Sequence, residues 1–122
     1  VLLKQEAVVS WEEGFIEGAQ FALQNKKVVY HIYNSVRREE VEKYLYHVAG
    51  DVMRQYVEAA AAGSRAKEED KKLIADFYKS ALVGMTLDWL NSGMKYAPEP
   101  LIRRLGVMLK GNIEEALKRA ES

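Results

Sequence analysis

Two histidines and their acidic neighbours are the side chains of this sequence that most readily suggest chemistry. His47 stands four residues before Asp51, a spacing that brings both side chains to one face of a helix. Neither His47 nor His31 belongs to an HExxH pattern or follows a glutamate by three residues, as zinc proteases and di-iron bundles require. We therefore interpret His47 and Asp51 as a solvated ion pair and His31 as a partly buried histidine with satisfied hydrogen bonds, and we expect no metal.

The patterns of covalent and phosphate chemistry are missing from the sequence. It has no cysteine, and Ser80 and Ser92 stand outside any nucleophile-elbow context. No glycine-rich loop follows a strand, and the acidic run around Glu39 and Glu40 is typical of a helix N-terminus. We expect no enzyme activity, no catalytic residue and no cofactor. A small helical-bundle enzyme or cofactor binder stays open as an alternative.

Aromatic side chains are the more suggestive set, because they come from several predicted helices. Tyrosines with an apolar ring and a polar tip suit the wall of a cavity for a small, hydrophobic or amphipathic ligand. The competing interpretation is ordinary core packing with the hydroxyl groups at the rim. The predicted wall residues are Trp11, Phe15, Tyr30, Tyr33, Tyr56, Phe77, Tyr78 and Met85.

Helices must position these residues, because apolar side chains recur every three to four positions along most of the chain. The one run with strand character, KVVYHIY, is too isolated for a sheet, and we interpret it as a short buried helix. We expect an all-α fold, a five-helix bundle with orthogonal and antiparallel packing. The predicted helices run from Ser10 to about Gln24, about Lys26–Asn34, Val36 to about Ala62, about Glu69–Ser92 and about Glu99–Ala120.

Helix ends carry recognisable signals in the sequence. Ser10 with Glu13 three residues later forms a capping box, and Gly93 fits the left-handed position that ends a helix. Pro98 lies close to the first turn of the closing helix, where proline is tolerated. We expect Gly111 to lie inside that helix, where a glycine lets another backbone come close.

Length, composition and charge restrict the class of protein. A chain of 122 residues with 48% hydrophobic residues is one domain with a real core. Eighteen basic and eighteen acidic residues cancel, which argues against nucleic-acid binding by this part of the protein. The absence of cysteine fits a reducing compartment, so we expect the cytoplasm, and no apolar run is long enough for a membrane helix. Residues 1–9 are interpreted as a tail or the end of a preceding linker helix.

The segment from about Glu69 to Ser92 has two apolar sides. One side carries Leu73, Phe77 and Gly84, and the other carries Ile74, Tyr78, Leu82, Met85 and Trp89. One side can be buried within the domain, whereas the other needs a partner unless a single chain covers both. Two copies of the last helical hairpin would form a four-helix bundle with two-fold symmetry. The predicted dimer-interface residues are Leu73, Gly84, Trp89, Leu101, Leu105, Met108, Leu109 and Ile113.

Three segments resemble the C-terminal regulatory domain of TetR-family transcriptional regulators. They are SWEEGFIEGAQFALQNKK from Ser10, NKKVVYHIYNSVRREEVEKYL from Asn25 and FYKSALVGMTLDWLNSGMKYAPEPL from Phe77. In the last of these, the family pattern of an aromatic start, a small-residue middle, a tryptophan, Gly-Met and a Pro-Glu restart is matched by Phe77-Tyr78, Gly84, Trp89, Gly93-Met94 and Pro98-Glu99.

The resemblance implies a homodimeric, all-helical domain over residues 10–122 that binds a small effector of unspecified identity. The last two helices of such domains form the dimer bundle. The family's N-terminal helix-turn-helix, which binds operator DNA, has no counterpart here, so we expect DNA contact only through a segment missing from this chain. The alternative is a helical adaptor domain that binds another protein and no DNA.

Overall fold

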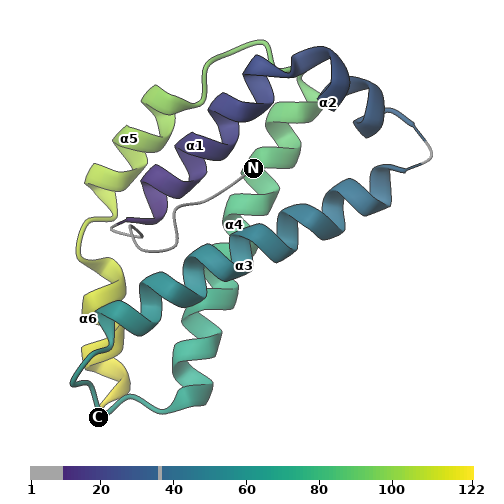
Figure 1. The fold of residues 1–122 in the computed structure, drawn as a ribbon. Coiled ribbons are helices and arrows are strands. Elements are labelled where there is room, and N and C mark those ends of the chain that lie inside the picture. The colour runs from purple at the N-terminus through teal and green to yellow at the C-terminus, as the bar shows by residue number, and fades with distance from the viewer. Residues whose placement is uncertain (1–9, 36) are drawn as a thin grey trace.

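The structure is a computed structural model that describes residues 10–35 and 37–122. This part of the chain forms six helices and no strand, which confirms the all-α class (Figure 1). The predictions for residues 1–9 and for a helix start at Val36 lie outside the described residues. The helices are α1 (Trp11–Gln24), α2 (Lys26–Tyr33), α3 (Arg38–Ala60), α4 (Glu68–Asn91), α5 (Glu99–Met108) and α6 (Asn112–Ala120).

The prediction of one closing helix, and with it of five helices, was wrong. Gly111 adopts a left-handed φ of 80° between α5 and α6, a conformation that interrupts the helical hydrogen bonds. A residue with a Cβ adopts this conformation only at a cost, whereas glycine does not. The break redirects the chain, so that α5 packs against α1 while α6 packs against α3 and α4 (Figure 1).

Two other helix ends follow the sequence signals closely. The backbone N–H of Glu13 donates to Ser10 Oγ at 3.2 Å, which confirms Ser10 as the cap of α1. After α4, Gly93 has φ 83°, and its N–H donates to the carbonyl of Leu90 while Met94 N–H donates to that of Trp89. This is the double hydrogen bond of a Schellman motif, as the glycine predicted.

The short helix α2 is less buried than expected. Val28 is 60% exposed and His31 lies at the surface, so the predictions of a buried helix and a partly buried histidine were wrong. Val29 and Tyr33, four residues apart, are the least exposed residues of α2, and Tyr33 is buried. The reason is position: among the described helices, α2 packs mainly against α1 and α3, and Tyr33 also bonds to Asn91 at the end of α4, so most of its other side chains stay exposed.

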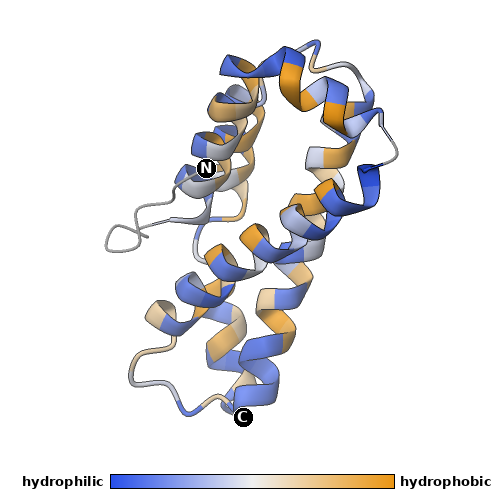
Figure 2. Cartoon of the chain, turned by 45° about the vertical axis from the view of Figure 1, so that its right-hand side comes forward, coloured by the Kyte–Doolittle hydropathy of each residue, from blue (hydrophilic) through white to orange (hydrophobic). Residues whose placement is uncertain are grey.

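The longest helices, α3 and α4, form an antiparallel pair that crosses at the centre of the molecule (Figure 1). Each helix carries apolar positions beside polar ones along its length (Figure 2). The buried side chains form two clusters. The α6-side cluster contains Met53, Val57, Ala75, Ile113 and Leu117, and the α2-side cluster contains Ala19, Tyr33, Trp89, Leu90 and Met94.

Candidate functional site: an apolar cavity between α1, α2, α3 and α4

A cavity of about 320 Å³ lies where α1 and α2 face α3 and α4. Its wall includes Trp11, Val52 and Leu82 from the α6-side cluster and Ala19, Trp89 and Leu90 from the α2-side cluster. The cavity therefore interrupts the core between the two clusters. Its volume lies at the lower end of the range for small-molecule sites in proteins.

Small residues on α1 explain why the space stays unfilled. Gly14, Gly18 and Ala22 follow one another at four-residue spacing and all line the cavity. A Cβ at Gly18 would meet no atom within 4 Å, whereas a Cβ at Gly14 would come within 3.3 Å of Val52. Gly14 thus lets α1 approach α3, and the missing side chain at Gly18 leaves open space in the wall of the cavity. Ala49 on α3 contributes a further small side chain.

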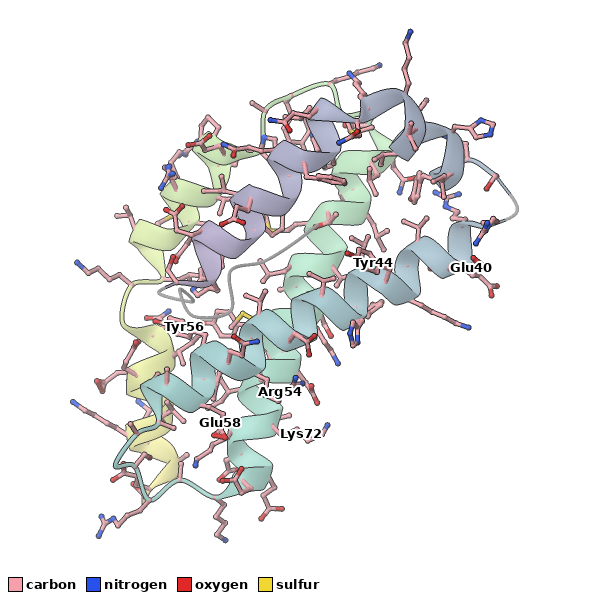
Figure 3. The ribbon with its side chains drawn as sticks, viewed as in Figure 1. Glu40, Tyr44, Arg54, Tyr56, Glu58 and Lys72 are labelled. Carbon is pink, nitrogen blue, oxygen red and sulfur yellow. The ribbon has the colours of Figure 1, made fainter. Side chains whose placement is uncertain are left out.

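The described wall of the cavity is almost entirely apolar and carries no charge. Four of its side chains contain a polar atom: Trp11, Tyr44, Thr86 and Trp89. Thr86 Oγ1 donates to the carbonyl of Leu82 at 2.8 Å, and Trp89 Nε1 donates to the carbonyl of Tyr96 at 2.7 Å. Tyr44, labelled in Figure 3, is 48% exposed and lies at the rim with Phe21 and Ile32.

The side of α4 that faces away from the cavity carries exposed apolar residues. Leu73 is 67% exposed and Phe77 is 70% exposed, and Met85 is also exposed. A Cβ at Gly84 would meet nothing within 4 Å. We call Leu73, Phe77, Gly84 and Met85 the outer row of α4. The inner side of the same helix, with Leu82, Val83 and Trp89, is buried.

The chain matches the family TetR_C_8, described as the transcriptional regulator C-terminal region, over residues 9–111. This match covers most of the sequence and all of the cavity wall. The chain belongs to this family of TetR regulator C-terminal regions. No curated protein and no solved structure matches the chain significantly.

Two of the predicted wall residues of this TetR-family domain, Trp11 and Phe15, line the cavity, and six lie elsewhere. Tyr30, Phe77 and Met85 are exposed, because their helical positions face solvent. Tyr78 packs against Trp11 at 6.2 Å between ring centroids and against Phe77 at 5.7 Å. Tyr33 and Tyr56 are held by hydrogen bonds outside the cavity.

The predicted dimer-interface residues of the TetR-family domain fall into three groups. Leu73, Gly84, Leu101 and Met108 are exposed. Leu105 and Leu109 are partly buried against the α6-side cluster. Trp89 and Ile113 are each 3% exposed, and Trp89 lines the cavity.

Tyr33 joins three helices near the α2-side cluster. Its hydroxyl donates to Asn91 Oδ1 at 2.9 Å and accepts from the guanidinium of Arg38 at 2.6 Å, which also donates to Asn91. The guanidinium carbon of Arg38 lies 4.2 Å from the centroid of the Tyr33 ring. These three residues, here called the Tyr33 clasp, tie α2 and the start of α3 to the end of α4. No local sequence pattern predicts this clasp, because Asn91 is 53 residues from Arg38 and 58 residues from Tyr33.

Tyr56 lies near the end of α3 that is farther from the Tyr33 clasp, toward α6 (Figure 3). Its hydroxyl donates to Glu114 Oε2 at 2.8 Å. Burial, together with the hydrogen bond and the charge of Glu114, raises the pKa of Tyr56 to about 12. Tyr56 therefore stays protonated at neutral pH and joins α3 to α6.

Charged groups are arranged on the outer surface of α3. His47 Nε2 and Asp51 Oδ2 are 3.4 Å apart, with His47 exposed and Asp51 partly exposed, so the two side chains meet as their spacing predicted. Arg54 and Glu58 lie on this outer surface as well (Figure 3).

Among residues 10–35 and 37–122, no three His, Asp or Glu side chains group as metal ligands would. None of the described helices combines the length and hydropathy of a bilayer-spanning segment.

Proposed function

We propose that this TetR-family domain binds a small effector in the cavity and forms a homodimer through the outer row of α4 and the closing helices. Effector binding then changes the DNA affinity of a helix-turn-helix segment elsewhere in the protein. The observation that carries the proposal is the cavity itself, which interrupts the core of a domain whose helix ends are otherwise well specified. A regulator of this kind acts on DNA in the cytoplasm.

The outer row supports homodimerisation. Leu73 and Phe77 are among the most exposed large apolar side chains described, and Leu101 and Met108 on α5 are exposed as well. Large apolar side chains grouped on one side of a helix are costly to leave in water, and stable interfaces bury about 800 Å² on each partner. A second copy of the same surface, related by two-fold symmetry, covers it without requiring any other protein.

Coupling between the two sites follows from the position of α4. Its inner side, with Val83 and Trp89, forms part of the cavity wall, and its opposite side carries the outer row. An occupant that changes how α4 crosses α3 also changes the relative orientation of two dimerised chains. Tenfold tighter binding to one arrangement shifts the equilibrium by about 1.4 kcal/mol. Half-sites on DNA lie about 34 Å apart, so a small change in spacing weakens both contacts.

Light scattering with size-exclusion chromatography tests the dimer. We expect a mass near twice the 13.9 kDa of the chain and a shift to the monomer mass in the double variant Leu73→Glu and Phe77→Glu. The matched control is Val28→Glu on α2, another exposed apolar residue, which should leave the dimer intact. A wild-type monomer would contradict the proposed dimer and favour the adaptor alternative.

Thermal unfolding in the presence of a varied panel of small molecules tests effector binding. A ligand that binds only the folded chain stabilises it by mass action, by about 2.7 kcal/mol at a hundred times its dissociation constant. We expect members of the panel to raise the melting temperature. A panel of neutral, anionic and cationic compounds without any such member would contradict effector binding.

A further inference from the structure

We infer that the effector is an electrically neutral molecule, with a mainly hydrocarbon or aromatic part of roughly ten non-hydrogen atoms inside the cavity. The inference rests on the proposed effector site and names the chemical class of its ligand. Carboxylates, phosphates and ammonium compounds are excluded as preferred ligands. Three features of the cavity support this class: the absence of charge in its wall, the hydrogen bonds that its polar atoms already make, and its volume.

The wall offers no partner for an ionised group. None of its described residues is acidic or basic, and aliphatic side chains such as Val48, Val52 and Leu82 surround the space. Arg38, the basic residue of the Tyr33 clasp, is not part of the wall, and its guanidinium donates to Tyr33 and Asn91. Moving an unpaired ion from water into such surroundings costs several kcal/mol.

The polar atoms of the wall do not require hydrogen bonds from a polar ligand either. Thr86 and Trp89 donate to backbone carbonyls of this chain, and the two other polar side chains, Trp11 and Tyr44, are uncharged. In the described part of the chain, no fully buried side-chain nitrogen or oxygen lacks a hydrogen-bond partner. The wall therefore accommodates one hydroxyl or carbonyl group near the rim at Tyr44, and otherwise only apolar atoms.

The volume sets the size of the part of the ligand that the cavity encloses, because the rim with Phe21, Ile32 and Tyr44 is open to solvent. A cavity of about 320 Å³ holds roughly ten atoms of the size of a water oxygen, each taking about 30 Å³ as in the liquid. An octyl chain with one terminal group has this size. The three probes 1-octanol, octanoate and octylammonium share this chain and differ in charge, so they separate charge from size.

Intrinsic fluorescence reports binding from inside the site, because the chain has two tryptophans and both line the cavity. At pH 8 we expect 1-octanol to change the fluorescence of Trp11 and Trp89 in a saturable way. Octanoate and octylammonium, which are ionised at this pH, should bind at least about a hundredfold more weakly, since a few kcal/mol correspond to two or more powers of ten.

A cavity-filling variant places the binding in the cavity. Gly18→Leu puts a side chain into open space in the wall and should abolish the response to 1-octanol. The control Ala59→Leu adds a similar side chain at an exposed position of α3 outside the wall and should leave the response unchanged.

Each other outcome overturns the inference in a recognisable way. If octanoate or octylammonium binds within tenfold of 1-octanol and Gly18→Leu abolishes that binding, the neutral class is wrong while effector binding stands. If 1-octanol binding survives Gly18→Leu, it occurs outside the cavity and the inference fails. If none of the three probes gives a saturable response, the inferred class is wrong. The broader panel described above then decides separately whether effector binding fails as well.

Discussion

The two ends of the α3–α4 pair are packed differently. Toward α6, Met53 and Val57 on α3 are almost completely buried, and Ile113 and Leu117 of α6 pack into the same cluster. Toward α2, the same two helices face α1 across the cavity. We call these the solid end and the hollow end. The difference lies in the third helix, because α6 supplies large apolar side chains and α1 supplies Gly14, Gly18 and Ala22.

Truncating one leucine at each end should produce the largest effect and the clearest contrast. Leu117 at the solid end is 2% exposed, so Leu117→Ala should lower the free energy of unfolding by about 3–5 kcal/mol. Leu45 lines the cavity and is only partly buried, so Leu45→Ala should cost roughly 1–2 kcal/mol, because it loses fewer contacts. Urea unfolding measures both values. Equal losses would show that the two ends are equally packed.

Two glycines of α1 sharpen the comparison within the hollow end. Gly18→Leu should raise stability by about 1 kcal/mol or more, because leucine favours the helix and its side chain has space. Gly14→Leu should destabilise the protein, because its Cβ alone would lie 3.3 Å from Val52. Thermal unfolding distinguishes the two variants. Destabilisation by Gly18→Leu would mean that the space beside Gly18 is already filled.

The Tyr33 clasp indicates that polar contacts help to hold the hollow end, where packing is incomplete. Tyr33→Phe removes the hydroxyl that donates to Asn91 and accepts from Arg38, and should cost about 1 kcal/mol of unfolding free energy. The control Tyr30→Phe changes an exposed tyrosine and should have no measurable effect. A Tyr33→Phe protein as stable as the wild type would show that the clasp contributes nothing.

Tyr56 gives the solid end a small alkaline pH dependence. Its pKa of about 12 in the folded chain exceeds the ordinary value of 10.0, so the protonated hydroxyl stabilises the fold below pH 10. This contribution is lost as the pH rises from 10 to 12. Spectrophotometric titration of the tyrosines should show one group near 12 that Tyr56→Phe removes. Loss of a group near 10 in that variant would contradict the environment described for Tyr56.

Local signals in the sequence predicted much of the fold. The cap at Ser10, the end of α4 at Gly93 and the two-sided character of α4 all depend on residues within a few positions of each other. The break at Gly111 was missed, because a glycine inside an apolar periodicity fits either a close helix contact or a left-handed turn. Which of the two occurs depends on how α6 packs against α3 and α4.

A ligand cavity was one of two interpretations of the aromatic residues, beside ordinary core packing, and most residues of the wall that the structure shows were not among the candidates. The candidates were large aromatic side chains, whereas the space results from small residues at Gly14, Gly18 and Ala22. Their four-residue spacing on the inner side of α1 was a signal available in the sequence. The side on which Phe77 would lie could not be read from the sequence, because apolar positions on both sides of α4 satisfied the helical period equally well.

Xenon-pressurised crystals test the central claim, the contrast between a hollow and a solid end, without any assumption about the natural ligand. Xenon enters apolar cavities that are empty of water. The structure predicts a xenon site bounded by Trp11, Val52 and Trp89, and none among the buried side chains of Met53, Val57 and Leu117. Crystals without xenon at that position, with Trp11 and Trp89 closed over the space, would contradict the account.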